Sequence, residues 1–225
     1  MASAGQVPDR EVPAEEFRNA MSHFATGVTV VTSVGADATP VGTTANAVTS
    51  LSLDPPLILV CFDLGSVTLR AIQGHGAFVV NVLAAAQRQL SANFARRGLA
   101  AAWDGVRHRH GPTGSPRLDG VLAVLECTVE HRLPGGDHEI VIGRVRHVET
   151  STAPAAPLVF FRGGYASLAS WPASTRISGT AAAAHPAMAA STSASSGSVT
   201  WRPRAGTVAP SSTRTGRRWT STASV

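Results

Sequence analysis

The chain of 225 residues is long enough for one domain with a hydrophobic core, or for such a domain with an appendage. Its formal net charge of +5 first suggests a nucleic-acid or membrane partner. However, all 19 basic residues are arginine, six of them lie in residues 169–225, and none of the 14 acidic residues does. Residues 1–168 therefore carry thirteen arginines against fourteen acids, a net charge of −1, which argues against a nucleic-acid-binding domain.

Targeting and membrane segments are not expected from the sequence. Residues 1–17 contain no apolar stretch of the kind found in a secretory signal, and the longest apolar run, Leu57–Phe62, is far too short to span a bilayer. Cys61 and Cys127 lie in separate apolar runs, so we expect two buried free thiols in a reducing compartment. The expected location is cytoplasmic.

The N-terminal half is predicted to begin with a short amphipathic helix. This helix follows Pro13, because Phe17, Met21 and Phe24 recur at helical spacing, and Gly27 can end it. The strands expected next are 28–34, Val41–Ala47, Leu57–Phe62 and Phe78–Leu83.

Two features of this half refine the prediction. Leu57–Phe62 is apolar throughout, which indicates a strand buried on both faces, and a Ser/Thr-rich bend precedes it. Ser66 is expected to cap a short helix that Gly74 and Gly76 can end.

The C-terminal half is predicted to contain one helix and then long strands. The helix spans Ala85–Phe94, and residues 98–120, rich in Gly, Pro and Arg, are expected to form a surface loop. The strands expected after it are Val121–Leu133, Glu139–Val148 and Leu158–Phe161, the first two joined by hairpin residues 134–137. Many strands with few short helices indicate a mainly β fold, a closed or nearly closed barrel.

Residues 169–225 differ in composition from the rest of the chain. They are rich in Ala, Ser, Thr, Gly, Pro and Arg, without a periodic apolar pattern. Such a segment buries too little surface to offset its ordering entropy, so a disordered low-complexity tail is expected. Either a functional segment or an out-of-frame reading of a GC-rich coding region would give this composition.

Two segments offer groups that could bind an anion or a ring edge. In residues 41–57, small and hydroxyl side chains on a strand edge leave amides and hydroxyls available to a ligand; the alternative is an ordinary Thr-rich strand and turn. In residues 61–70, a strand leads through Gly65 into a helix start that presents amides to an anion; the alternative is a plain capped helix.

Two further segments add aromatic and basic candidates. Phe94 could cover a flat ring and Arg96 or Arg97 could meet a phosphate, or Phe94 could belong to the core and the arginines to a solvated helix end. His138, at the mouth of a hairpin, could contact a nicotinamide nucleotide or simply be solvated.

The order of these blocks resembles the short-chain flavin reductase family. Members of this family are the reductase components of two-component flavin-dependent monooxygenases and have the FMN-binding split-barrel fold. The matching blocks are F-A-T-G-V-T-V-V-T (24–32), G-T-T-A-N-A-V-T-S-L-S-L-D-P-P-L (42–57), F-V-V-N-V-L (78–83), E-C-T-V (126–129), G-D-H-E-I-V-I-G (136–143) and P-L-V-F-F-R-G-G-Y (157–165). By resemblance, residues 12–168 form such a domain, whereas family members usually end soon after the last block.

The resemblance implies a flavin site, with FMN and FAD both open. The residues implied to contact the flavin are Val41, Gly42, Thr43, Thr44, Ala45, Asn46, Ala47, Cys61, Asp63, Ser66, Val67, Thr68, Phe94 and Ala95. His138 and Tyr165 match positions that the family places near the nicotinamide nucleotide, NADH or NADPH. The implied reaction is hydride transfer from nicotinamide C4 to flavin N5, which calls for positioning and for no acid–base or metal catalyst.

The implied activity is that of an NAD(P)H:flavin oxidoreductase that supplies reduced flavin, by diffusion, to a partner monooxygenase. A homodimer is implied as well, and no nucleic-acid or membrane partner. The alternatives are a split-barrel oxidoreductase that keeps its flavin and reduces another acceptor, and a non-catalytic flavin- or haem-binding module. A metal site at His108 and His110 is a third alternative, disfavoured by their cationic setting and by the lack of a nearby acid or Cys at ligand spacing.

Overall fold

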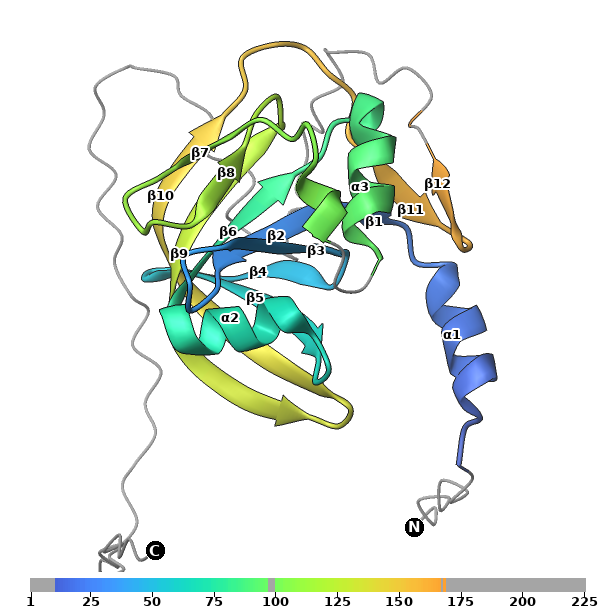
Figure 1. The fold of residues 1–225 in the computed structure, drawn as a ribbon. Coiled ribbons are helices and arrows are strands. Elements are labelled where there is room, and N and C mark those ends of the chain that lie inside the picture. Colours follow the sequence, from blue (N-terminus) through green and yellow to red (C-terminus); the bar gives the residue numbers. More distant parts are fainter. Residues whose placement is uncertain (1–10, 97–99, 167, 169–225) are drawn as a thin grey trace, which may run out of the picture. The chain divides into compact units, whose positions relative to one another are not determined.

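The fold, a computed structural model, is described for residues 11–96, 100–166 and 168, all within one compact unit (Figure 1). Its main element is an antiparallel sheet of seven strands in the order β3-β2-β6-β9-β10-β5-β4. These strands are β2 (Thr29–Val34), β3 (Pro40–Ala45), β4 (Val48–Leu53), β5 (Pro56–Asp63), β6 (Ala77–Val82), β9 (Ala123–Gly135) and β10 (His138–Thr150).

Shorter elements surround this sheet. Two small sheets are formed by β1 (Thr26–Gly27), β11 (Val159–Phe161) and β12 (Gly164–Ala166), and by β7 (His108–His110) with β8 (Pro116–Leu118). The helices are α1 (Ala14–Ser22), α2 (Val67–His75), α3 (Arg88–Phe94) and the 3₁₀ turns η1 (Ala85–Gln87) and η2 (Ala100–Trp103). The expected mainly β architecture is confirmed, but in the described part of the chain no ladder joins the two edge strands β3 and β4, so the barrel is open there.

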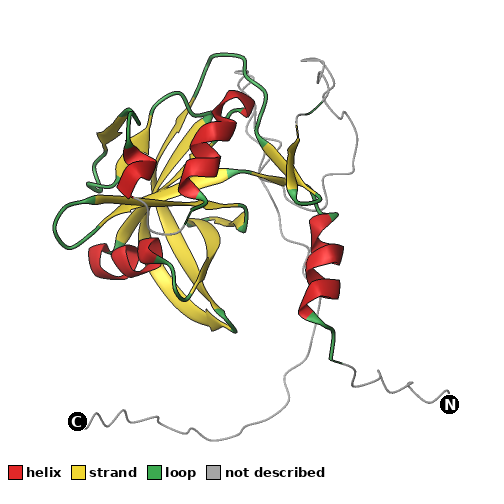
Figure 2. Ribbon diagram, turned by 45° about the vertical axis from the view of Figure 1, so that its right-hand side comes forward, coloured by secondary structure: helices red, strands yellow, loops and turns green. Residues whose placement is uncertain are grey.

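The sheet has a hydrophobic core on each face. On one face Val31 and Val80 pack with Leu69 and Ile72 of α2. The opposite face holds the second core, to which α3 and η2 contribute, and Figures 1 and 2 show α2 and α3 on different sides of the sheet. This double cover explains why β2 and β6 are buried on both faces.

The local signals for α2 are confirmed. The amide of Leu69 donates to the Ser66 hydroxyl at 3.2 Å, which satisfies one donor of the first helical turn. At the other end Gly76 takes the left-handed conformation, with φ of 75°, and its amide donates to the carbonyl of Ile72. Ser66 and Gly76 therefore fix both ends of the helix that stands beside β5.

Three sequence predictions differ from the structure. Leu57–Phe62 is not buried on both faces: in β5 buried and half-buried residues alternate, because one face meets the core and the other is only partly covered. The Ser/Thr-rich bend contains the edge strand β4, which is largely exposed and so needs no apolar pattern. Residues 100–120 are not a plain surface loop, since they contain η2, β7 and the buried strand β8.

The remaining predictions concern the cysteines, the first helix and the tail. Cys61 and Cys127 are free thiols, Cys127 fully buried and Cys61 half-buried. The predicted first helix is present as α1, but it ends at Ser22, before Phe24 and Gly27, and it buries no residue within this chain. Among the described helices, none combines the length and apolar character needed to cross a membrane. The predicted tail, residues 169–225, lies outside the described residues.

Candidate functional site

A pocket of about 450 Å³ opens where the sheet is not closed. Five parts of the fold meet there: strand β3 with the turn after it, the end of β5, the start of α2, the end of α3 with η2, and the start of β10. Its volume lies in the range of about 300–1,000 Å³ typical of cofactor sites. The chain therefore builds one wall from an edge strand and another from a helix N-terminus.

Most of the predicted site residues line this pocket. They are Val41, Gly42, Thr43, Thr44, Ala45, Asn46, Ala47, Cys61, Asp63, Ser66, Val67, Thr68, Ala95 and His138. Segments that are up to about a hundred residues apart in the sequence are thus brought to one cavity. The predicted residues that do not line it are Phe94 and Tyr165.

The β3 wall presents backbone groups to the cavity. Among the described strands β3 pairs with β2 alone, so its outer edge is left to a ligand. The Thr44 hydroxyl donates to the carbonyl of Ser91 at 2.6 Å and the Thr29 hydroxyl to that of Ala45 at 2.7 Å, which ties the strand to its surroundings. The wall is therefore rigid, polar and uncharged.

A second wall carries the N-terminus of α2. Asp63 shapes the approach, because its carboxylate accepts a hydrogen bond from the amide of Gly65 at 2.8 Å and its carbonyl accepts one from the amide of Ser66. The chain then enters a nine-residue helix whose first-turn amides and positive dipole end face the same cavity as β3. Such an arrangement suits a phosphate group.

Phe94 supports the pocket from behind and does not cover a ligand. Its side chain is 2% exposed and belongs to the core, on the far side of β3. A Cβ on Gly42 would lie 2.9 Å from Phe94 Cε1, so the absent side chain lets the strand lie directly on this ring. The expectation that Phe94 covers a flat ring is therefore not met by its side chain, because packing against the core holds the ring away from the cavity.

The two residues expected beside the nicotinamide nucleotide are not brought together in this chain. His138 lines the pocket, and its Nδ1 lies 2.7 Å from Asp137 Oδ1; this contact holds the pKa of the Asp137 carboxyl below its ordinary value. Tyr165 instead packs on α3, with its hydroxyl 2.8 Å from Ser91 Oγ and the Arg88 guanidinium above its ring.

Trp103 is a pocket residue that the sequence prediction missed. It lies in η2, inside the segment expected to be a surface loop, and forms an edge contact with Phe94 at a ring-centroid distance of 5.0 Å. A lone tryptophan among small and charged residues was the available signal. Arg96, one of the two arginines considered for a phosphate, also lines the pocket, whereas Arg97 lies outside the described residues.

The chemistry of the lining is mostly neutral. Burial raises the pKa of the Cys61 thiol, which therefore stays protonated at neutral pH. In the described part of the chain no group of three His, Cys, Asp or Glu side chains is placed to hold a metal ion. Hydroxyls, amides, one helix N-terminus and the free edge of β3 fit a phosphorylated ring system such as a flavin nucleotide.

Comparison with known proteins agrees with this geometry. Over 175 residues the chain is 41% identical to the NADH-dependent FMN reductase AsuE2 of Streptomyces nodosus subsp. asukaensis, covering 74% of this chain and 92% of the relative. It is 40% identical over 159 residues to the 4-hydroxyphenylacetate 3-monooxygenase reductase component of Thermus thermophilus. This match covers 70% of this chain and 98% of the relative. By contrast, it spans about half the length (47%) of a Rhizobium meliloti protein described as a probable flavin reductase.

The fold has close structural neighbours too. The NADH:FAD oxidoreductase SgcE6 of Streptomyces globisporus, solved in complex with NAD and FAD fragments, superposes with a TM-score of 0.64 at 35% identity, covering 69% of this chain and 92% of that one. The model of the flavin reductase like domain matches residues 21–169, which include every wall of the pocket. The chain therefore belongs to the flavin reductase-like domain family.

Proposed function

We propose that the chain is an NAD(P)H:flavin oxidoreductase, formed by residues 12–168, that reduces FMN or FAD and supplies the reduced flavin to a partner monooxygenase. The observation that carries this proposal is the pocket of about 450 Å³. Its lining combines the uncharged edge strand β3 with the N-terminus of α2. Hydride transfer between two bound rings requires no acid–base catalyst, so a pocket that positions both rings is sufficient.

The flavin supplies the electron-accepting ring when it is bound. The outer edge of β3, with Asn46 and Ala47, is assigned to orient that ring through backbone groups. Ser66, Val67 and Thr68 are assigned to the phosphate, since they form the first turn of α2. Cys61, Asp63 and Ala95 complete the wall, and Phe94 acts by supporting β3.

His138 is assigned to the nicotinamide nucleotide. It stands at the mouth of the pocket, and Asp137 orients its ring through the 2.7 Å contact at Nδ1, which leaves Nε2 for the incoming nucleotide. The hydroxyl of Tyr165 contacts Ser91 and its ring lies under the Arg88 guanidinium. Within one chain, His138 is therefore the residue assigned to contact the nicotinamide nucleotide. Positioning two rings face to face can supply about 7–11 kcal/mol of the rate enhancement in favourable cases.

We also propose that the protein is a cytoplasmic homodimer. Phe17 and Met21 on α1 and Phe24 just after it form an apolar surface that is 59%, 51% and 69% exposed in the single chain. A second copy is the proposed cover for this surface, because monomers seldom leave such large side chains together in water. No nucleic-acid or membrane partner is assigned.

A steady-state assay tests the function. The purified full-length chain is mixed with NADH or NADPH and with free FMN or FAD in all four combinations. The expected result is many turnovers of nicotinamide oxidation per protein with free flavin. Tight retention of one flavin equivalent, with turnover only on another acceptor, would instead favour the flavin-retaining oxidoreductase. Flavin binding without any nicotinamide oxidation would favour the binding module.

A further inference from the structure

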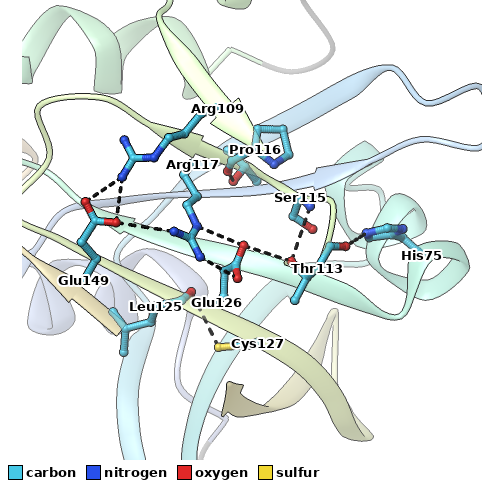
Figure 3. A network of polar contacts seen from close by, with 11 residues as sticks. His75, Arg109, Thr113, Ser115, Pro116, Arg117, Leu125, Glu126, Cys127 and Glu149 are labelled. Carbon is cyan, nitrogen blue, oxygen red and sulfur yellow. Dashed lines mark hydrogen bonds and ion pairs between the residues drawn. The ribbon is translucent and has the colours of Figure 1, made fainter. Parts of the chain in front are cut away.

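A buried ion pair lies on the face of the sheet that carries α3. Glu126 of β9 is fully buried, and Arg117 of β8 is 6% exposed. The guanidinium donates to both carboxylate oxygens, from Nε at 3.1 Å and from Nη2 at 2.9 Å (Figure 3). Because buried charges are costly to desolvate, a pair that is held this completely calls for an explanation.

The ion pair is one of three attachments that hold β8 on the sheet. The carbonyl of Pro116 accepts a hydrogen bond from the Thr32 hydroxyl, and the amide of Leu118 donates to Asn81 Oδ1 at 2.9 Å. Thr32, Asn81 and Glu126 lie on the adjacent strands β2, β6 and β9, so three consecutive residues of β8 are each bound by a different strand. Side chains of three sheet strands thus bind β8 across the sheet.

Further residues surround the Arg117–Glu126 ion pair on the side of the β7–β8 hairpin. Glu149 of β10 accepts from Arg117 at 3.5 Å and from Arg109 of β7 at 2.6 Å (Figure 3). Gly111, in the turn between β7 and β8, lies so close that a Cβ there would overlap Glu126 Oε1 and Arg117 Nε. The β7–β8 hairpin therefore closes over the ion pair and is anchored on both of its strands.

This hairpin reaches the pocket wall through His108. His108, at the start of β7, packs against Trp103 with ring centroids 5.0 Å apart. Trp103 also contacts Phe94, with ring centroids 5.0 Å apart, and it lines the pocket. A continuous series of contacts therefore runs from Glu126 through Arg117, the hairpin and His108 to the pocket wall.

We propose that Trp103 is a flavin-contacting residue and that the Arg117–Glu126 ion pair positions it, through β8, β7 and His108. The proposal deepens the assignment of the pocket to a flavin and rests on it. An aromatic side chain at the α3 end would lie against a flat ring or base of a nucleotide in the pocket that the start of α2 also lines. Glu126 and Arg117 are positioning residues, since they act only through Trp103.

The test uses Trp103 as its own reporter. The chain has four tryptophans, and replacing the other three (Trp171→Phe, Trp201→Phe and Trp219→Phe) leaves Trp103 alone in the full-length protein. FMN is expected to quench its emission strongly. In Glu126→Gln we expect a red-shifted emission without FMN, a KM for FMN raised about three- to tenfold, and kcat within about twofold of the parent.

A control pair, bidentate like Arg117–Glu126 but more exposed, is present on the same strand. Glu130 of β9 forms an equally bidentate pair with Arg144, with Nε to Oε2 at 2.8 Å, and this pair has no contact with the hairpin among the interactions of the described residues. Glu130→Gln should leave the emission and the KM unchanged. A folded Glu126→Gln protein with parental emission and KM, or an equal change in Glu130→Gln, overturns the proposal.

A second variant decides the case if Glu126→Gln does not fold. His108→Ala leaves the ion pair intact and removes only the last contact before Trp103, so it should reproduce the red shift and the higher KM. Parental values in His108→Ala overturn the proposal. The emission of Trp103 without FMN reports positioning alone, whereas failure of the parent protein to bind FMN would count against the proposed function.

Discussion

At the scale of single residues, Gly42 and Cys61 each determine a property of the pocket wall. Gly42 carries no side chain, and this lets β3 rest on the ring of Phe94 while its outer edge faces the cavity. Cys61 is one of the few reactive side chains in the wall, half-buried and uncharged because burial raises the pKa of its thiol. It can therefore report directly on whether the cavity is filled.

FMN should protect Cys61 from alkylation. Under mildly alkaline conditions that produce some thiolate, a maleimide should label Cys61 slowly in the empty pocket. At an FMN concentration ten times the dissociation constant, the rate should fall about tenfold, because only the empty fraction reacts. Peptide mass spectrometry measures the labelling at each cysteine.

Cys127 is the internal control for this experiment. It is fully buried, and burial together with the nearby Glu126 carboxylate raises the pKa of its thiol to about 12, so it should stay unlabelled with or without FMN. Labelling of Cys61 at the same rate with and without saturating FMN would place the flavin elsewhere.

At the scale of secondary-structure elements, sequence reasoning succeeded where local signals decide the structure. The β-branched run of β2, the Ser66 cap of α2 and the long hairpin of β9 and β10 all follow from neighbouring residues. The same holds for most of the pocket, because its walls are contiguous blocks of sequence.

The elements that sequence reasoning missed are fixed by distant contacts. Strand β8 consists of Pro116, Arg117 and Leu118, which carry no strand pattern, and it is held by side chains from three other strands. Strand β4 pairs only at the edge of the sheet and is largely exposed. Trp103 was missed for the same reason, since its place in the wall depends on the position of β7.

The start of α2 gives a prediction that separates capping from phosphate binding. In Ser66→Asp the new carboxylate still caps the helix, so the thermal stability should change little. The added negative charge faces the proposed phosphate site, so the affinity for FMN should fall about tenfold or more. Riboflavin, which has no phosphate, should bind as before, and fluorescence titration measures both ligands.

The control for this prediction is Ser66→Ala. It removes the hydroxyl that accepts from Leu69, at a cost of about 1 kcal/mol in the free energy of unfolding, without adding charge. Its affinity for FMN should therefore fall much less than that of Ser66→Asp. If Ser66→Asp lowers the affinities for FMN and for riboflavin equally, the phosphate is not bound at the start of α2.

At the scale of the whole molecule, two features of the single chain are exposed: the free edge of β3 and the apolar residues of α1. The free edge of β3 faces the pocket, and α1 leaves its apolar residues exposed. A nine-residue helix that buries no residue in its own chain has little to stabilise it, because isolated helices of this length are only marginally stable in water. Packing against the proposed second copy would stabilise it.

Met21→Glu should convert the proposed dimer into monomers. Met21 lies in the middle of the apolar surface of α1, and a charge buried there without a partner should weaken association by about two orders of magnitude or more. Asn19→Glu provides the control, since Asn19 lies about 200° around the helix from Phe17, on the opposite side. Sedimentation velocity over a range of concentrations should show a dimer for the parent and for Asn19→Glu, and a monomer for Met21→Glu. If the parent sediments as a monomer at every concentration, the apolar surface of α1 has another partner and the dimer assignment is wrong.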